Sequence, residues 1–348
     1  MHAGAGGMTA SAPGKVVLSF VAGAFVAAQI QAAETPPVTP KVSAAGSGAG
    51  YPSKPIRFIA PNLPGGPTDI LARLIGQKLS ESWGQSVIVE NRAGAGGNIG
   101  TEMAARSPSD GYTLVTGNNA TFGANMSLYQ RLGFDPVKDF APVVLVATQP
   151  NILVVHPSLP VSSVRSLIAL AKARPGELNY SGSGVGAAAH LAAELFKTMT
   201  RTNIVHVPYK SAAPALTALI AGQTQLMFAT SLSVTPHVTA NRLRAMAVTT
   251  ARRSRLMPEL PTIAEAGVPG FEATTWHGVL VPAGTPAAIV DRLNSEINRI
   301  LQLPDVRERL TTLGAEIVGG TAREFADHIR REIPKWAKVV KESGAKAD

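Results

Sequence analysis

The fold is decided by a glycine-containing turn with the sequence Pro61-Asn62-Leu63-Pro64-Gly65-Gly66-Pro67-Thr68-Asp69. An apolar run, residues 56–60, enters this turn. After it, large apolar side chains recur at the spacing of one helical face, at Ile70, Leu71, Leu74, Ile75, Leu79 and Trp83. That spacing predicts a helix beginning near Thr68 or Asp69 and ending at Gly84. The stretch is therefore a strand-to-helix turn, as found in α/β proteins.

The turn has the chemistry of an anion site. Two adjacent glycines let the backbone adopt conformations that are closed to other residues. The first N–H groups of the following helix have no partner within the helix, and the helix dipole makes this end positive. Anions bind at such helix starts. An ordinary capped turn has the same residue types, so this stretch alone leaves both interpretations open.

A second turn of the same design occupies residues 178–190, Leu178-Asn179-Tyr180-Ser181-Gly182-Ser183-Gly184-Val185-Gly186-Ala187-Ala188-Ala189-His190. Gly182, Gly184 and Ala187 fit a loose dinucleotide-binding pattern. The next predicted strand, however, ends in Tyr209 and Lys210, where that pattern expects an acidic residue for the ribose. A third glycine-rich loop at residues 91–100 also misses the nucleotide spacings. An α/β enzyme or nucleotide-binding protein using these loops remains the alternative to an anion receptor.

Composition narrows the possible functions. With 348 residues, of which 45% are hydrophobic, the chain can bury a large core and form about two domains. Its formal charge is +9, but Lys and Arg are spread along the chain with acids between them, which indicates a solvated surface and no nucleic-acid partner. The absence of cysteine excludes disulfides, thiolate metal sites and cysteine nucleophiles. The seven histidines are scattered without metal-ligand spacing, and no catalytic residue set is recognisable. We therefore expect no metal, no cofactor and no catalysis.

The amino terminus has the order of a secretory signal peptide. Lys15 precedes the apolar run at residues 16–28, and small residues that suit cleavage follow it. We predict a signal peptide over residues 1–33 and a disordered linker, rich in Pro and Gly, over residues 34–50. Because Lys15 is the only lysine or arginine before the apolar run, an uncleaved membrane anchor is the alternative.

The rest of the chain alternates predicted strands and helices, as parallel α/β units do. Two nearly continuous apolar runs, residues 143–147 and 152–155, suit buried strands, and we place the crossover between domains near residues 145–155. Ligands in α/β sheets gather at the carboxyl ends of strands. That rule adds Thr230, Ser231, Thr249 and Thr250 as candidate site residues.

Short motifs follow one another along about residues 51–344: Tyr51-Pro52, Lys54-Pro55, Pro64-Gly65-Gly66-Pro67-Thr68-Asp69, Val89-Glu90-Asn91-Arg92, Gly94-Ala95-Gly96-Gly97, Asp110-Gly111-Tyr112, Asp139-Phe140, Asn179-Tyr180, His190-Leu191, His206-Val207-Pro208-Tyr209-Lys210, Pro261-Thr262, Glu265-Ala266-Gly267 and Pro282-Ala283-Gly284-Thr285-Pro286. In their order and spacing these motifs resemble those of the Bug-type periplasmic substrate-binding receptors of the tripartite tricarboxylate transporter family. Each motif is weak alone, and their order and spacing together carry the assignment.

The resemblance implies an α/β, two-lobed periplasmic binding protein of the type II-like, Venus flytrap kind. Each lobe would be a mixed, mainly parallel sheet flanked by helices, with residues 51–148 plus 277–348 in lobe 1 and residues 149–276 in lobe 2. It further implies a monomeric, non-catalytic receptor without cofactors, located in the periplasm. Such a receptor binds a small organic carboxylate between the lobes and delivers it to a tripartite tricarboxylate-type membrane permease.

The same resemblance places the ligand on backbone amides of two glycine loops, one from each lobe. By position, the candidate ligand-binding residues are Leu63, Pro64, Gly65, Gly66 and Asp69 from lobe 1, and Ser181, Gly182, Ser183, Gly184, Tyr209, Lys210 and Thr230 from lobe 2. The sequence departs from the family pattern at Asn62-Leu63, Ala187, Ala188, Ser211 and Gln225. The loss of hydroxyls at Ala187 and Ala188 favours a ligand with a less hydroxylated or more apolar tail.

Overall fold

A computed structural model describes residues 50–255 and 257–347 of the chain. The predicted signal peptide, residues 1–33, and all but the last residue of the predicted linker lie outside these described residues. Among the residues described, none of the helices combines the length and the apolar character needed to cross a bilayer.

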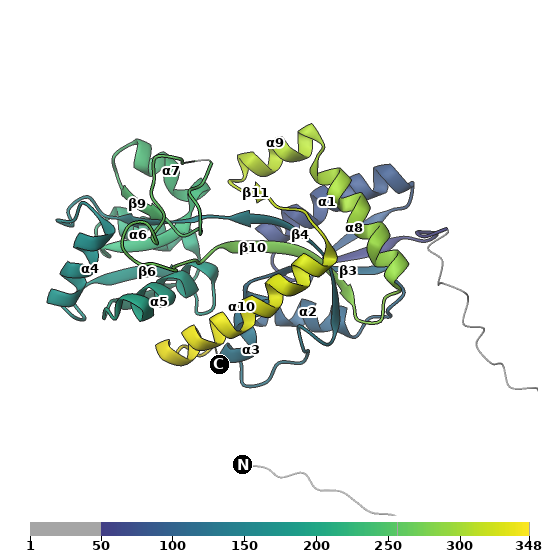
Figure 1. The fold of residues 1–348 in the computed structure, drawn as a ribbon, viewed down its shortest axis with the longest axis horizontal. Helices are drawn as coiled ribbons and strands as arrows, with labels where there is room; N and C mark the ends of the chain where they lie inside the picture. The colour runs from purple at the N-terminus through teal and green to yellow at the C-terminus, as the bar shows by residue number, and fades with distance from the viewer. Residues whose placement is uncertain (1–49, 256, 348) are drawn as a thin grey trace, which may run out of the picture. The chain divides into compact units, whose positions relative to one another are not determined.

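The first sheet has six strands in the order β11-β4-β10-β3-β1-β2 (Figure 1). Its strands are β1 (Ile56–Ala60), β2 (Val87–Asn91), β3 (Thr113–Asn118), β4 (Phe140–Gln149), β10 (Thr275–Pro282) and β11 (Glu316–Ile317). The helices joined to it are α1 (Pro67–Trp83), α2 (Asn98–Ala105), α3 (Asn125–Leu128), α8 (Ala287–Leu301), α9 (Pro304–Thr312) and α10 (Ala322–Ser343), with short turns η1 (Ala95–Gly97) and η2 (Ala120–Ala124).

The second sheet has five strands in the order β7-β6-β8-β5-β9. Its strands are β5 (Asn151–Val155), β6 (Asn179–Ser183), β7 (Val205–Tyr209), β8 (Leu226–Thr230) and β9 (Arg244–Val248). Its helices are α4 (Val164–Ala173), α5 (Ala188–Thr200), α6 (Ala212–Ile220) and α7 (Ser231–Thr239). Two mixed sheets flanked by helices confirm the predicted fold class.

The two sheets contain fewer parallel strand pairs than the prediction of mainly parallel sheets requires. β1 pairs in parallel with β2 and β3, and β6 pairs in parallel with β7 and β8. All other strand pairs of the two sheets are antiparallel. The reason lies in the connections: β4 leads through Pro150 into β5 of the second sheet, and β10 brings the chain back to the first. Strands that carry the chain in opposite directions can pair with each other only in the antiparallel sense.

The opening turn folds as its sequence predicts. Helix α1 begins at Pro67, directly after Gly66, because proline at the first helical position has no N–H to satisfy and its φ suits a helix. The helix ends at Gly84, whose φ of 67° is left-handed. Leu71, Ile75 and Leu79 are buried in the core beneath it, as the periodicity predicts.

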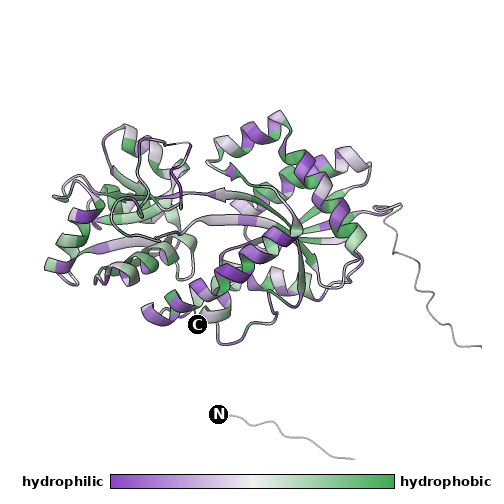
Figure 2. Cartoon of the chain, viewed as in Figure 1, coloured by the Kyte–Doolittle hydropathy of each residue, from purple (hydrophilic) through white to green (hydrophobic). Residues whose placement is uncertain are grey.

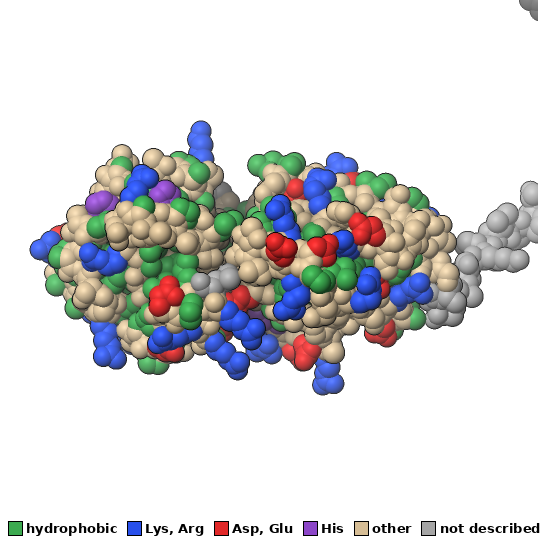
Figure 3. Space-filling view, turned by 90° about the horizontal axis from the view of Figure 1, so that it is seen from above, with side chains coloured by type: hydrophobic (Ala, Val, Ile, Leu, Met, Phe, Trp, Pro, Cys, Tyr) green, Lys and Arg blue, Asp and Glu red, His purple; other side chains and the backbone are tan. Residues whose placement is uncertain are grey.

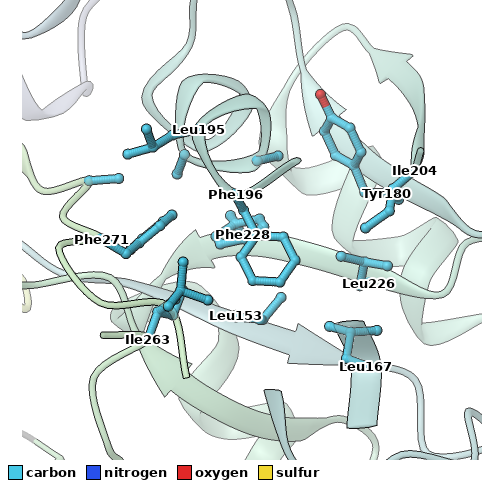
Figure 4. Close-up of a cluster of buried hydrophobic side chains, with 14 of the residues drawn as sticks. Leu153, Leu167, Tyr180, Leu195, Phe196, Ile204, Leu226, Phe228, Ile263 and Phe271 are labelled. Carbon is cyan, nitrogen blue, oxygen red and sulfur yellow. The ribbon is translucent and has the colours of Figure 1, made fainter. Parts of the chain in front are cut away.

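Helix α10 contacts parts of both sheets. Its side chains Trp336, Val339 and Val340 belong to the hydrophobic cluster that also contains Phe196 and Phe228 of the second sheet and its helices (Figure 4). Closer to its amino-terminal end, Phe325 packs in another cluster against the first sheet. Figure 2 shows polar and apolar residues alternating along this helix, as expected for an amphipathic helix lying on a core. The lobe boundaries at residues 148 and 277 stay a prediction.

Candidate ligand-binding cleft

A cleft of about 950 Å³ is lined by residues from both sheets. The first sheet contributes its loops at residues 62–68 and 93–97, and the second contributes Ser183, residues 187–189, Ala212, residues 227–230 and Ser233. The remaining lining residues lie in or beside strands β3, β4, β5 and β10, and are Asn118, Gln149, Asn151, Thr275 and His277. The strands that connect the sheets therefore form part of the wall of the cleft.

The first loop is held by Asp69. Its carboxylate accepts hydrogen bonds from the Gly65 N–H at 2.8 Å and from Asn91 Nδ2 at 2.9 Å, and it forms an ion pair with Arg73. Burial raises the pKa of Asp69, but the hydrogen bonds from Arg73, Gly65 and Asn91 outweigh it and leave the pKa lowered. Asp69 therefore stays ionised at neutral pH and fixes the loop that faces the cleft.

The other two glycine loops are also held by neighbouring groups. In the second loop, the Gly186 N–H donates to Nδ1 of His190, a buried imidazole whose pKa is lowered to about 4 mainly by burial. In the third loop, Asn125 Nδ2 donates to the Gly96 carbonyl. Gly96 and Gly97 have positive φ, which favours glycine there. All three loops are thus held by hydrogen bonds to neighbouring groups of the protein.

Five helices begin at the wall of the cleft: α1, α2, α5, α6 and α7. None of the five has a side-chain hydrogen bond to cap its first turn. Of the helices that begin away from the cleft, α4 and α10 have complete capping boxes at Ser163 and Thr321, whereas α3, α8 and α9 have no side-chain cap either. Helix starts without a side-chain cap, with their positive dipole ends, therefore converge on the cleft from both sheets.

The lining of the cleft carries no formal charge. Among the described residues that line it, none is Lys, Arg, Asp or Glu, and His277 is its single titratable side chain. Figure 3 shows the Lys and Arg side chains spread over the outer face, with Asp and Glu between them. An anion in the cleft would be held by backbone and side-chain dipoles.

The polar wall at the connecting strands has unpaired atoms. Asn151 Nδ2 donates to Thr275 Oγ1 at 3.1 Å, and Gln149 Nε2 donates to the Leu313 carbonyl at 2.8 Å. Gln149 Oε1 and both ring nitrogens of His277 are buried without a hydrogen-bond partner. Because buried polar atoms in proteins are almost always hydrogen-bonded, such atoms mark a place for a ligand or water. Burial lowers the pKa of His277 to about 4.

The structure places six of the twelve predicted site residues in the lining of the cleft: Leu63, Pro64, Gly65, Gly66, Ser183 and Thr230. Ser231, Thr249 and Thr250, the other candidates at strand ends, do not line it. Asp69 lies behind the first loop and positions it.

The other predicted residues lie outside that lining for identifiable reasons. Ser181 and Gly182 lie within strand β6, and a side chain at Gly182 would meet His206 Nε2 at 2.8 Å. Gly182 therefore has a packing reason to be glycine. Gly184 follows the same strand, Tyr209 packs against a hydrophobic cluster and Lys210 is exposed. A contact of these residues with a ligand stays a prediction.

Sequence reasoning missed the polar wall. The two apolar runs at residues 143–147 and 152–155 lie on either side of Gln149 and Asn151, and the prediction of buried strands there does not mark these polar residues as site residues. A polar residue interrupting an otherwise apolar strand was the available signal. Metal binding has no structural support in the part of the chain that is described, since no three His, Asp or Glu side chains there are grouped to hold an ion.

Two mixed sheets connected by paired strands, with an uncharged cleft at the ends of several helices, define a solute-binding protein of the periplasmic binding protein class. The chain belongs to the family of tripartite tricarboxylate transporter receptors, whose model matches residues 71–345. The resemblance stated from the motifs is thereby confirmed. Members of this family are solute receptors.

Individual relatives agree with this assignment. Protein BugT of Bordetella pertussis is 40% identical over 297 residues, covering 85% of this chain and 91% of BugT. The structure of R. palustris Rpa4515 with adipate superposes with a TM-score of 0.74 at 42% identity, covering 85% of this chain and 99% of that one. MatC from Rhodopseudomonas palustris with bound malate gives a TM-score of 0.71 at 32% identity, covering 83% of this chain and 100% of that one.

Proposed function

We propose that this protein is a non-catalytic periplasmic receptor that binds a small organic carboxylate in the cleft and delivers it to a tripartite tricarboxylate-type permease. The observation that carries the proposal is the convergence of five uncapped helix starts on a cleft without charged side chains. Such starts bind anions through N–H groups and the helix dipole. Adipate and malate in the two related structures are both carboxylates, which supports the same ligand class here.

In this proposal a carboxylate group of the ligand binds between the two predicted glycine loops, residues 63–66 and residues 181–184. Backbone N–H groups and ordered water would hold its oxygens. Pro67 has no N–H and cannot donate, so the donors come from the residues around it. Asp69 and His190 act indirectly, because each accepts a hydrogen bond from a loop glycine.

The alternative, a nucleotide-binding protein or α/β enzyme, has less support. A nucleotide would bring several phosphate charges into a cleft whose lining contains no lysine or arginine among the described residues. Phosphate sites in nucleotide-binding proteins commonly add a lysine or a metal ion to the glycine loop. A single carboxylate suits helix dipoles alone.

Calorimetric titration tests the proposal. We expect binding of one or more members of a carboxylate panel (succinate, malate, adipate, hexanoate and benzoate) and no binding of ATP, NAD or inorganic phosphate at the same concentration. Nucleotide binding without binding of any carboxylate at millimolar concentration would overturn it. Mass spectrometry of ligand that co-purifies with the periplasmic protein would then identify the natural compound, and pull-down with the membrane fraction would test the permease.

A further inference from the structure

The strongest unexplained feature of the cleft is the imidazole of His277. Its exposed fraction is 4%, and neither ring nitrogen has a hydrogen-bond partner. A neutral imidazole offers one donor and one acceptor, so two hydrogen-bonding functions are left unpaired at one place. Leaving buried polar groups without hydrogen-bond partners costs stability.

His277 lies where the cleft meets a second, smaller chamber. This chamber has a volume of about 230 Å³ and shares Gly65, Pro67, Gln149, Thr230 and His277 with the cleft. The rest of its wall is apolar and consists of Ile70, Leu71, Leu232, Leu310, Leu313 and Ala315. A ligand that extends from the glycine loops toward this chamber therefore reaches the wall in which His277 and Gln149 are the polar residues. The ring nitrogens of His277 are enclosed in this structure, so the ring must turn toward the cleft for a ligand to bind them.

Most charged side chains on the elements around His277 form ion pairs with one another. Strands β3 and β4 carry no titratable side chain. Helix α2, which packs on β10, carries Glu102, which pairs with Arg106. Helix α10 carries Glu332, which pairs with Lys335 and accepts a hydrogen bond from Trp276 of β10. On α1, Asp69 pairs with Arg73, and Lys78 pairs with Glu81 and Asp305. Helix α7 carries His237, and β11 carries Glu316, which accepts a hydrogen bond from Ser254. Helix α9 also carries the exposed Arg307, Glu308 and Arg309. Burial alone lowers the pKa of His277, without a contribution from a charged neighbour.

We propose that His277 determines specificity at the far end of the cleft: it binds a second carboxylate of the ligand and takes up one proton as that carboxylate arrives. This inference rests on the proposed function, because the first carboxylate is the one held by the glycine loops. The ligand class is a dicarboxylate whose two charges are joined by an apolar spacer. Protonation converts an unpaired imidazole into a cation beside an anion, and the apolar chamber excludes the water that would weaken this ion pair.

The proposed proton uptake sets the direction in which ligand affinity changes with pH. Burial lowers the pKa of His277 to about 4, so the imidazole is neutral at neutral pH when no anion lies beside it. A bound carboxylate raises this pKa. Affinity is therefore greatest at low pH and falls as pH rises through the interval between the free and the bound pKa, by up to about tenfold per pH unit. At pH 6 and above both ligand carboxyls are mostly ionised, although the charge on the first carboxylate raises the pKa of the second.

The decisive experiment is calorimetric titration of the whole protein with adipate and with hexanoate, which has the same chain length and one carboxylate. Each titration is run at pH 6.5 in phosphate and in imidazole buffer, whose ionisation enthalpies differ. We expect the adipate enthalpy to depend on the buffer, showing proton uptake, and the hexanoate enthalpy not to depend on it. Adipate affinity should fall from pH 6 to pH 7.5.

The variant His277→Gln keeps a neutral side chain that can hydrogen-bond but cannot take up this proton. We expect it to lose the proton uptake and to bind adipate at least about tenfold more weakly, with hexanoate affinity unchanged. His156→Gln is the matched control, because His156 bonds to Ser158 and does not line the cleft. Circular dichroism checks that both variants fold. Histidine proton NMR of the wild type gives the His277 pKa directly, whatever the behaviour of the variants.

The outcomes separate this inference from the proposed function. Adipate binding with no buffer dependence, or with proton uptake that persists in His277→Gln, overturns the role of His277 and leaves the receptor function standing. Failure of every carboxylate to bind overturns both. Equal pH dependence for adipate and hexanoate assigns the proton to another group and also overturns the role of His277.

Discussion

The N–H of Gly65 donates a hydrogen bond to the carboxylate of Asp69 across one turn, with an N···O distance of 2.8 Å. This contact joins the exposed tip of the first loop to the first turn of α1. The same carboxylate accepts from Asn91 Nδ2 at the end of β2, so Asp69 fastens the loop to both the helix and the neighbouring strand.

Replacing Asp69 should therefore weaken ligand binding without removing any residue that lines the cleft. We expect Asp69→Ala to lower the free energy of unfolding by about 1–3 kcal/mol, because two donors lose their partner. Ligand affinity should fall about tenfold, as measured by calorimetry. Arg73→Ala is the control, since it removes only the largely exposed member of the ion pair and should cost less than about 1 kcal/mol. Equal effects of the two variants would contradict this role of Asp69.

A second prediction concerns Gly66, which lines the cleft. Its φ of −78° is accessible to any residue, and a Cβ there would meet only the Leu63 carbonyl, at 3.4 Å. We expect Gly66→Val to leave the melting temperature nearly unchanged and to reduce ligand affinity by about tenfold or more, because the added methyl groups crowd the loop. Unchanged affinity would remove this loop from the binding site. Gly84→Val, at the other end of α1, should show the opposite pattern because its φ is left-handed.

The sequence was sufficient for the elements and for the first loop because their signals are local. The spacing of Leu71, Ile75 and Leu79 predicts α1 directly, and the adjacent Gly65 and Gly66 predict the turn before it. The polar wall has no such signal. Gln149 and Thr275 are far apart in the chain and become neighbours only through the antiparallel register of β4 and β10. Long-range register of this kind cannot be read from local periodicity.

The glycine motif at residues 182–186 shows a second limit. A glycine can be required by a ligand, by a left-handed backbone or by a close neighbour, and the sequence does not distinguish these causes. At Gly182 the neighbour is His206, whose ring also stacks on Tyr180 with centroids 4.6 Å apart. At Gly186 the cause is a φ of 84°. From the sequence, the glycines of this motif are predicted to be ligand contacts. Packing against His206 is a sufficient reason for glycine at position 182.

A third prediction uses the pH dependence of an ion pair on the first sheet. Hydrogen bonds from Arg57 are the main cause that lowers the pKa of Glu90 to about 2, and a hydrogen bond from Arg92 adds to the effect. A group with a lowered folded-state pKa stabilises the protein above its unfolded pKa of about 4.3, and this stabilisation is lost as pH falls toward 2. Because this ion pair is partly exposed, we expect Glu90→Gln to be less stable than the wild type at pH 6 by up to about 1 kcal/mol, and the difference measured by urea unfolding to shrink below pH 4. A constant difference from pH 6 to pH 3 would contradict the assignment.

A fourth prediction concerns Glu332, a buried carboxylate on α10. It accepts hydrogen bonds from Trp276 Nε1 at 3.0 Å and Trp336 Nε1 at 2.7 Å, and it pairs with Lys335. Glu332→Ala leaves two buried indole donors without an acceptor, so we expect a loss of stability of about 3–5 kcal/mol. Tryptophan fluorescence should report the change, because Trp276 and Trp336 are two of the three tryptophans in the chain. Glu342→Ala, which removes an exposed carboxylate, should change stability by less than about 0.5 kcal/mol.

The last prediction concerns closure on the ligand. The connecting segments, β4 through Pro150 into β5 and the return strand β10, carry the polar wall of the cleft, so a ligand held by loops of both sheets would favour a conformation that brings those loops together. We expect the radius of gyration in solution scattering to decrease when the protein is saturated with a carboxylate that binds. Gly66→Val at the same ligand concentration should show a smaller decrease, in proportion to its lower occupancy. Saturation by calorimetry without a decrease in the wild type would exclude closure and leave binding intact.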